Sequence, residues 1–232
     1  MKLSKRLTQI ESMVMPGYTH IWDCCCDHGL LGAELLSRQA AEHVHFVDVL
    51  PELIDRLTDK LQRFYLHLHA AWHTHCLDVA ALPLGQYSGK QLIIIAGVGG
   101  TLMARFIQAI HQRNPTANID FLLCPVHQEY GLRQQLIALG FSLKQESLVK
   151  DNQRFYEILL VSTGQEQTGV YRNISPIGDV IWQVETHEQE RVAKGYLNKT
   201  LKHYQNMQWG NSEDVQHVID AYRAVVIGYS GA

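Results

Sequence analysis

The most distinctive chemical groups of the chain follow its first apolar run, residues 20–24. Residues 23–29 read Asp-Cys-Cys-Cys-Asp-His-Gly. A nucleotide-binding α/β fold places a glycine-rich turn at this point, on the carboxyl edge of its sheet. A dinucleotide site asks for G-x-G-x-x-G, whereas only Gly29 and Gly32 are present here. The segment therefore indicates a nucleotide-like ligand and argues against a dinucleotide.

Two further carboxylates follow later apolar runs. Asp48 ends the run 44–48, where an acidic side chain accepts hydrogen bonds from ribose hydroxyls. Asp78 follows the run 71–76 and could accept a hydrogen bond from the exocyclic amine of an adenine. The alternatives are an ordinary strand-end aspartate for Asp48 and a helix or turn cap for Asp78.

Glycines gather after the fourth apolar run, where residues 96–100 read Ala-Gly-Val-Gly-Gly. Glycine lets the backbone approach a ligand closely. A dinucleotide fingerprint belongs to the first strand, so this position again argues against NAD. Ala96, Gly97 and Gly99 are expected to contact a cofactor.

The histidines and cysteines raise two other possibilities, a metal site and a disulfide scaffold. His-x-His at residues 67–69 and 73–75 would place two rings on one face of a strand, as in some metal sites. No partner carboxylate is specified nearby, so half-buried or surface histidines and no metal are expected. Five cysteines, three of them adjacent at 24–26, lack the spacing of a zinc site and the density of a disulfide scaffold, which predicts reduced thiols.

The elements that position these groups can be placed from hydrophobic pattern. Helical periodicity begins near Leu30, Pro51, Thr101 and Glu129. Alternating strands and helices predict an α/β fold, a parallel sheet with helices on both faces. The five runs predicted as its strands are residues 20–24, 44–48, 71–76, 92–96 and 119–124.

The end of the sheet distinguishes between two fold classes. Residues 141–149 and 155–161 are β-rich and separated by a segment too short for a crossover helix, which predicts an antiparallel hairpin. A Rossmann-like sheet that ends in such a hairpin is the arrangement of class I methyltransferases, whereas an NAD domain normally ends in another parallel strand. The topology therefore favours S-adenosylmethionine (SAM) as cofactor.

The remainder of the chain predicts a smaller, helical part. Residues 162–180 are polar and rich in helix breakers, like a linker. Helices are predicted from about 186 to 207 and from 215 to 226, with Gly210 ending the first and Ser212 capping the second. We therefore divide the chain into residues 1–165, a SAM-binding methyltransferase domain, and residues 166–232, a linker and a coiled-coil-like helical hairpin.

Composition sets limits on partners. The chain has 232 residues and a net charge of −3 at pH 7, so an RNA partner would have to be held locally rather than by bulk charge. No stretch of the sequence approaches the roughly 18 consecutive apolar residues that a membrane-spanning helix needs. The basic N-terminal residues are not followed by the apolar stretch of a signal peptide, which predicts a cytoplasmic protein. The oligomeric state is not indicated.

Several motifs, taken together, resemble one enzyme family. These are residues 3–7 (Leu-Ser-Lys-Arg-Leu), Asp23 with Asp27-His28, residues 95–102 and residues 154–159. The combination is similar to the bacterial tRNA (adenine(22)-N(1))-methyltransferases over nearly the whole chain. The resemblance implies SAM as cofactor, methylation of N1 of an adenosine in tRNA, and a C-terminal hairpin that helps hold the tRNA.

If the chain catalyses that reaction, catalytic, cofactor-binding and substrate-binding roles can be expected for particular residues. Attack by adenine N1 makes the ring cationic, so a carboxylate would stabilise the transition state. Asp27 is the candidate, with His28 orienting it or contacting phosphate; the alternative is that Asp27 caps the following helix. Cofactor contacts are expected from Asp23, Cys25, Gly29, Asp48, Asp78, Ala96, Gly97 and Gly99, and substrate contacts from Arg6, His127, Tyr156, Arg191, Lys194, Lys199 and Lys202. The alternatives are a core position for Tyr156 and a solvated helix face for the last four residues.

Two departures from the family pattern leave alternatives open. Cys25 stands where the family has glycine, which adds a side chain at a tight turn beside the ligand and predicts either a strained backbone or a shifted SAM. Residues 124–127 read Cys-Pro-Val-His where the family has a Q-P-N-like turn, beside the expected substrate pocket. The acceptor could therefore be another RNA, a protein or a small molecule, or the chain could be a SAM- or RNA-binding module without catalysis.

Overall fold

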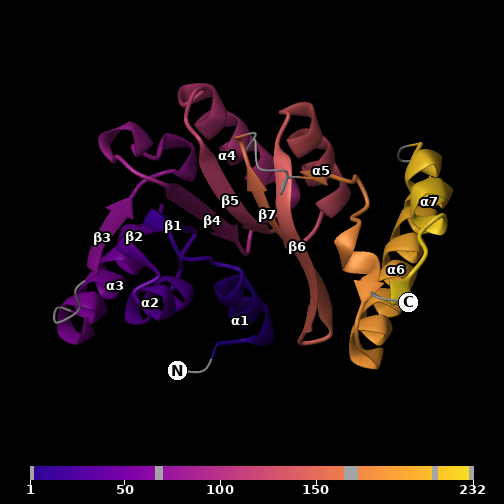
Figure 1. The fold of residues 1–232 in the computed structure, drawn as a ribbon, viewed down its shortest axis with the longest axis horizontal. Coiled ribbons are helices and arrows are strands. Elements are labelled where there is room, and N and C mark those ends of the chain that lie inside the picture. Colours follow the sequence, from indigo (N-terminus) through magenta and orange to yellow (C-terminus); the bar gives the residue numbers. More distant parts are fainter. Residues whose placement is uncertain (1–2, 66–69, 165–171, 211–213, 230–232) are drawn as a thin grey trace.

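The computed structural model describes residues 3–65, 70–164, 172–210 and 214–229. Most of the chain forms an α/β unit around one large sheet, and two helices stand together beyond β6 and α5 at one end of it (Figure 1). The strands of the large sheet are β1 (Tyr18–Cys24), β2 (Ala41–Asp48), β3 (Ala71–Cys76), β4 (Gln91–Ala96), β5 (Ile119–Cys124), β6 (Ser142–Asp151), β7 (Arg154–Ser162) and β8 (Arg172–Asn173).

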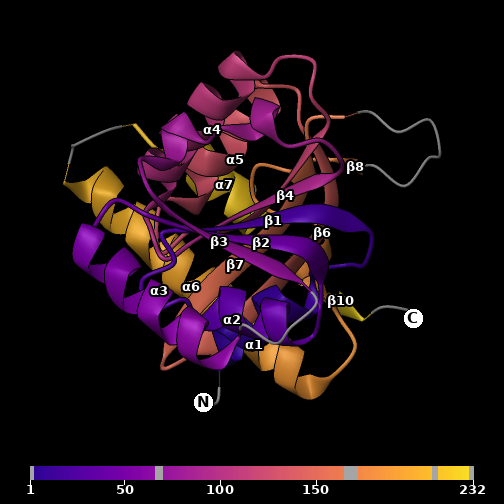
Figure 2. The ribbon, with the colours of Figure 1, turned by 90° about the vertical axis from the view of Figure 1, so that its left-hand side faces the viewer.

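Helices cover both faces of the sheet (Figure 2). The apolar runs of β4 and β5 are buried because α1 and α2 pack on one face and α4 and α5 on the other, while α3 packs on β2. The helices are α1 (Lys5–Ser12), α2 (Leu30–Ser37), α3 (Pro51–Phe64), α4 (Gly100–Arg113), α5 (Glu129–Ala138), α6 (His187–Trp209) and α7 (Gln216–Arg223). Short elements are the 3₁₀ turns η1 (Val79–Ala81), η2 (Leu84–Gln86) and η3 (Val180–Trp182), and a small sheet of β9 (Gln183–Val184) and β10 (Gly228–Tyr229).

The strand order is β3-β2-β1-β4-β5-β7-β6-β8. The first five strands are parallel, and β7 is antiparallel to both β5 and β6. The predicted strands, the four predicted crossover helices and the antiparallel hairpin are therefore confirmed. Because the parallel strands all end at the same edge, their following loops meet there.

The structure adds elements that the pattern did not predict. Helix α1 precedes the first strand, with Ser4 as its N-cap. Part of the predicted linker pairs with β6 as β8. The predicted last helix ends at Arg223, three residues before its expected end, while α6 ends at its C-cap Gly210 as expected. Ser212, His67 and His69 lie outside the described residues.

One face of β1, β2 and β3 carries a group of rings that we call the histidine cluster: His20, His43, His45, His73 and His75. Cross-strand hydrogen bonds join its rings, with nitrogen separations of 3.0 Å for His20–His45 and for His45–His75. Tyr87 packs edge-on against His45, at 4.7 Å between ring centroids. Only 3₁₀ turns connect β3 to β4, so no helix covers the outer rings, which are half-buried.

Hydrogen bonding fixes the tautomers of three of these rings. His20 Nε2 lies 3.1 Å from the carbonyl of Ser88, which can only accept, so this nitrogen carries the proton. The Nδ1 of neutral His20 then accepts from His45 Nε2, and His45 Nδ1 accepts from His75 Nε2. All three hydrogen bonds are therefore satisfied when these rings are neutral. Within the described ranges, no three His, Cys, Asp or Glu side chains are arranged to hold a metal ion.

We expect the histidine cluster to make folding sensitive to acid. Burial and neighbouring histidines lower the pKa of His20, His73 and His75, and lower that of His45 to about 2. Below about pH 6.5 the unfolded chain binds protons that the folded chain excludes. The free energy of unfolding therefore decreases as the pH is lowered. For His45 the loss is about 2 kcal/mol between pH 6.5 and pH 5.

Urea unfolding between pH 5 and pH 8 measures this slope. His45→Gln should reduce it, whereas His203→Gln, at an exposed position on α6, should leave it unchanged. An identical slope in the His45 variant would contradict the assignment.

Candidate active site

The turn after β1 is built from left-handed residues. Cys25, Asp27 and Gly29 have φ values of 57°, 48° and 63°. The turn is held by hydrogen bonds from the Cys26 amide to the Val47 carbonyl (3.2 Å) and from the Gly29 amide to the Cys26 carbonyl (2.7 Å). A left-handed conformation is unfavourable for residues with a Cβ atom. The strained backbone predicted at Cys25 is therefore present.

Two buried aspartates fix this turn from within. The Asp23 carboxylate accepts a hydrogen bond from the Gly32 amide at 2.9 Å, and burial raises the pKa of Asp23 to about 7. A Cβ at Gly32 would lie 2.3 Å from the Phe46 ring, so only glycine fits there. Asp48 accepts from the Asp27 amide at 3.2 Å through one oxygen and from the Leu50 amide at 3.1 Å through the other.

The carboxyl ends of β1, β2 and β3 bring their acidic groups together around Cys25. Burial, followed by the charges of Asp48, Asp23 and Asp78, raises the pKa of the Cys25 thiol to about 11. The thiol is therefore neutral, in agreement with the expectation of reduced, unreactive cysteines. Asp78 also accepts from the Ala80 amide at 2.8 Å, so the capping role left open for it is present in the structure.

The loops after β4 and β5 are joined by backbone hydrogen bonds. The Val126 amide donates to the Val98 carbonyl at 3.0 Å, and the Gly100 amide donates to the His127 carbonyl at 2.9 Å. A Cβ at Gly99 would lie 2.3 Å from the His127 ring, which packs directly over this glycine. Gly97 has a φ of 95° and no atom within 4 Å of a built Cβ, so the space beside it is open to a ligand.

Asp27 and His28 lie exposed at the same edge. His28 Nε2 is 3.6 Å from Asp27 Oδ1, and the two side chains are 68% and 66% exposed. Helix α2 begins after Gly29 with no side-chain cap. The alternative in which Asp27 caps this helix is therefore not what the structure shows.

Among the predicted substrate residues, Arg6 and Tyr156 come together. The Arg6 guanidinium lies 5.0 Å from the centre of the Tyr156 ring, and Arg6 acts to lower the pKa of the Cys124 thiol at the end of β5. The Arg6 amide donates to Asp151 at 3.2 Å, which ties α1 to the tip of the β6–β7 hairpin. These contacts place a cation and an aromatic ring beside the carboxyl end of β5.

The four basic residues predicted on α6 divide into two pairs. Arg191 forms an ion pair with Glu188, and Lys194 forms one with Glu190. Lys199 instead lies 5.8 Å from the centre of the Phe155 ring, and Lys202 is exposed. Within the part of the chain that the structure describes, neither Lys199 nor Lys202 forms a salt bridge.

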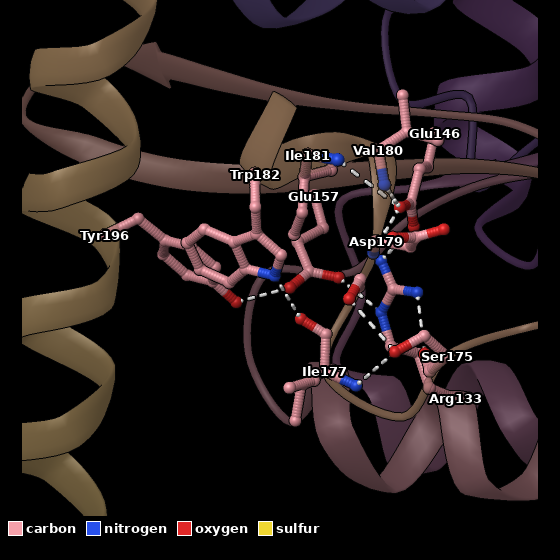
Figure 3. A network of polar contacts seen from close by, with 11 residues as sticks. Arg133, Glu146, Glu157, Ser175, Ile177, Asp179, Val180, Ile181, Trp182 and Tyr196 are labelled. Atoms are coloured by element: carbon pink, nitrogen blue, oxygen red, sulfur yellow. Dashed lines mark hydrogen bonds and ion pairs between the residues drawn. The ribbon is translucent and has the colours of Figure 1, made fainter. Parts of the chain in front are cut away.

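A buried ionic network that the sequence reasoning missed fastens α6 to the sheet (Figure 3). The Arg133 guanidinium is fully buried and donates to Glu157 at 2.7 Å and to Glu146 at 2.6 Å. Glu157 also accepts from the Tyr196 hydroxyl at 2.5 Å. Glu146 accepts from the backbone amides of residues 179–181, which lie in η3 and just before it.

The reasoning also missed Glu129, the first residue of α5. Burial, followed by repulsion from Glu157, raises the pKa of Glu129 to about 7. The signal that could have found it is its position, since an acidic residue directly after the loop that follows β5 faces the same edge as the other candidate residues.

Comparison with known proteins assigns the fold. The family model described as a methyltransferase domain matches residues 3–159. A comparison with curated protein sequences gave no match. In the described part of the chain, no helix combines the length and the apolar character that crossing a membrane requires.

Three solved structures are similar over nearly the whole chain. Sp1610 from Streptococcus pneumoniae has 22% identity and a TM-score of 0.71, with 96% of this chain and 95% of that chain covered. TrmK from M. capricolum, in complex with S-adenosyl-homocysteine, has 14% identity and a TM-score of 0.70, covering 96% and 94%. The m1A22 tRNA methyltransferase TrmK from B. subtilis has 17% identity and a TM-score of 0.67, covering 96% and 94%. The predicted class I methyltransferase fold is confirmed.

We expect Cys25→Gly to stabilise the fold. A left-handed non-glycine residue costs about 1–2 kcal/mol, and the extra freedom of glycine in the unfolded chain offsets about 0.4–1 kcal/mol of the relief. The free energy of unfolding should rise by about 0.5–1 kcal/mol, measured by urea titration. Cys25→Ala keeps the Cβ and should show no such gain. A loss of stability confined to the glycine variant would show that Cys25 is favourable at this turn.

Proposed function

Because this chain belongs to the methyltransferase-domain family, we propose that it transfers the methyl group of SAM to N1 of an adenosine in tRNA. The observation that carries the proposal is the extent of the structural similarity. Structures of tRNA m1A22 methyltransferases align with 96% of the chain, well beyond the residues of the family model. One of them contains S-adenosyl-homocysteine, the product of SAM.

The edge formed by β1 to β4 fits such a cofactor. Its loops leave open space beside Gly97, and Asp48 and Asp78 keep lone pairs that can accept from hydroxyl and amine groups. When bound, SAM supplies an activated methyl group. We assign this binding to residues 1–165, through the turn with Cys25 and Gly29, Asp23, Asp48, Asp78 and the loop containing Ala96, Gly97 and Gly99.

Asp27 supplies a charge where the reaction needs one. Adenine N1 donates its lone pair to the methyl carbon, and the adenine ring becomes cationic. The Asp27 carboxylate caps no helix, and among the residues that the structure describes its one ion pair is with His28, so it is available to stabilise that cation. His28 either orients Asp27 or contacts a phosphate of the RNA.

Residues 166–232 hold the tRNA in this proposal, with Arg6, His127 and Tyr156 contributing from the catalytic side. Arg191 and Lys194 are already paired with glutamates, so Lys199 and Lys202 are the stronger candidates for phosphate contacts. A tRNA substrate also places the protein in the cytoplasm.

The direct test uses SAM and unmodified tRNA. The full-length protein is incubated with both, the RNA is digested, and 1-methyladenosine is sought by mass spectrometry, while calorimetry measures SAM binding. Product at a single adenosine supports the proposal. SAM binding without RNA methylation would point to another acceptor, and absence of SAM binding would remove the enzyme function altogether.

We expect Asp27→Asn to reduce kcat about 100-fold and to change the Kd for SAM less than about twofold, because its role lies with the charge that develops on adenine. Single-turnover rates and calorimetry measure the two effects. Asp55→Asn, at an exposed position on α3, is the matched control and should match the wild type. Equal losses in both quantities would reassign Asp27 to cofactor binding.

We expect the double variant Lys199→Gln/Lys202→Gln to weaken tRNA binding and to flatten its salt dependence. Two lost phosphate contacts reduce the slope of log K against log salt by about 1.4–1.8. Arg191→Gln/Lys194→Gln removes the same formal charge from the same helix, but from cations that are already neutralised, and should have a smaller effect. Similar effects of the two double variants would mean that all four residues attract the RNA through their overall charge rather than through specific phosphate contacts.

Point variants are better suited than truncation for this question. Deleting the residues after 165 would remove Tyr196 from Glu157 and the backbone amides of residues 179–181 from Glu146. Both carboxylates are buried, so the truncated protein would lose stability for reasons unrelated to RNA.

A further inference from the structure

Glu129 occupies a position between the cofactor loops and the C-terminal helices. It follows the loop after β5, whose residues Val126 and His127 are hydrogen-bonded to the loop after β4. On its other side, the next residue, Tyr130, packs edge-on against the Tyr204 ring of α6, at 6.3 Å between ring centroids, and Lys199 of α6 acts to lower the pKa of Glu129. Its carboxylate thus lies where the proposed SAM-binding loops meet the helix proposed to hold tRNA.

The carboxylate lacks the partners that the neighbouring acidic groups have. Glu146 and Glu157 each share the Arg133 guanidinium and accept additional hydrogen bonds. Glu129 is half-buried, yet among the described residues its side chain forms no salt bridge and no hydrogen bond with the side chain of another residue. A carboxylate taken out of water without a partner is unfavourable for folding alone.

Charged groups on three elements act on it. Glu157 of β7 repels it, whereas Lys199 of α6 and Arg133 of α5 attract it. Arg6 of α1 and Glu129 both influence the Cys124 thiol at the end of β5. Burial and Glu157 outweigh the cations and raise the pKa of Glu129 to about 7. A cation or a hydrogen-bond donor placed beside Glu129 would therefore be favoured, and a methylated adenine ring is such a group.

We infer that Glu129 contacts the target base and that its carboxylate accepts a hydrogen bond from the exocyclic amine of adenine. This inference rests on the proposed function. In the reaction, the N1 lone pair forms the new N–C bond, the S–C bond breaks and its electron pair stays on sulfur. The adenine ring gains one positive charge, which the ionised Glu129 offsets in surroundings less polar than water. Asp27 is more exposed, so its charge is more strongly screened.

The same hydrogen bond to Glu129 makes the site selective for a purine that carries the exocyclic amine. A carboxylate accepts a hydrogen bond from an amine, but a purine that lacks the exocyclic amine leaves this group unpaired in a half-buried position. Glu129 is thus a specificity-determining residue as well as a stabilising one.

The experiment compares full-length wild type, Glu129→Gln and Glu185→Gln, the last an exposed control just before α6. Single-turnover methylation of tRNA is followed from pH 5.5 to pH 9, with SAM binding measured by calorimetry. The wild-type rate should rise with pH through an apparent pKa near 7, because the ionised carboxylate is the active form. Glu129→Gln should lose this inflection and fall about 10- to 100-fold, with SAM affinity unchanged and the control like wild type.

Two further measurements separate a contact with the base from a structural role. Glu129→Gln removes an unpaired charge, so its melting temperature at pH 8 should equal or exceed that of wild type. A tRNA carrying purine riboside at the methylated position should be a poorer substrate than the adenosine form for wild type, and the variant should show a much smaller difference.

The outcomes are distinguishable. If wild type methylates tRNA and Glu129→Gln does so at the same rate and with the same pH profile, this inference is wrong and the proposed function stands. Loss of SAM affinity equal to the loss of rate, or a fall in melting temperature, would also overturn it. If wild type methylates no tRNA, both the inference and the proposed function fail.

Discussion

The position of the C-terminal helices depends on one buried guanidinium. Arg133 has no exposed surface, and it holds two equally buried carboxylates, Glu146 and Glu157. Burying charge is costly, and the arrangement is stable only because every member has further partners. Attraction to the guanidinium and hydrogen bonds from backbone amides lower the pKa of Glu146 against the effect of burial, and the two carboxylates raise that of Arg133. Removing any one member would leave a charge in the interior without compensation.

This network also positions the site. Arg133 lies one turn after Glu129 on α5, so fixing the guanidinium fixes the start of the helix and the loop before it. That loop is bonded to the loop after β4, where Gly97 and Gly99 lie. Glu157 also holds α6, because its carboxylate accepts a hydrogen bond from Tyr196 of that helix. The position of α6 in turn places Lys199 over the Phe155 ring. A continuous set of contacts thus links the proposed cofactor edge to the proposed RNA-binding helix.

The sequence predicted what depends on local pattern. Apolar runs and helical periodicity gave the strands, the crossover helices and the closing hairpin, and parallel strands necessarily gather Asp23, Asp48 and Asp78 at one edge. Contacts between distant residues could not be read in this way, because neither the pairing of Arg133 with Glu146 and Glu157 nor the bonds of the histidine cluster follow from any spacing. The ion pairs of Arg191 and Lys194 were readable, since Glu188 and Glu190 precede them at helical i, i+3 and i, i+4 spacing.

The turn after β1 shows why the departure at Cys25 is compatible with the fold. Two non-glycine residues, Cys25 and Asp27, adopt left-handed conformations there, and such strain persists only where surrounding contacts over-determine the backbone. Asp48 supplies one of those contacts by accepting the Asp27 amide. Burial, followed by the charges of Asp48, Asp23 and Asp78, keeps the Cys25 thiol protonated. A neutral thiol is a poor nucleophile, so a cysteine at this turn is compatible with the proposed SAM site, because it would not compete with the base for the methyl group.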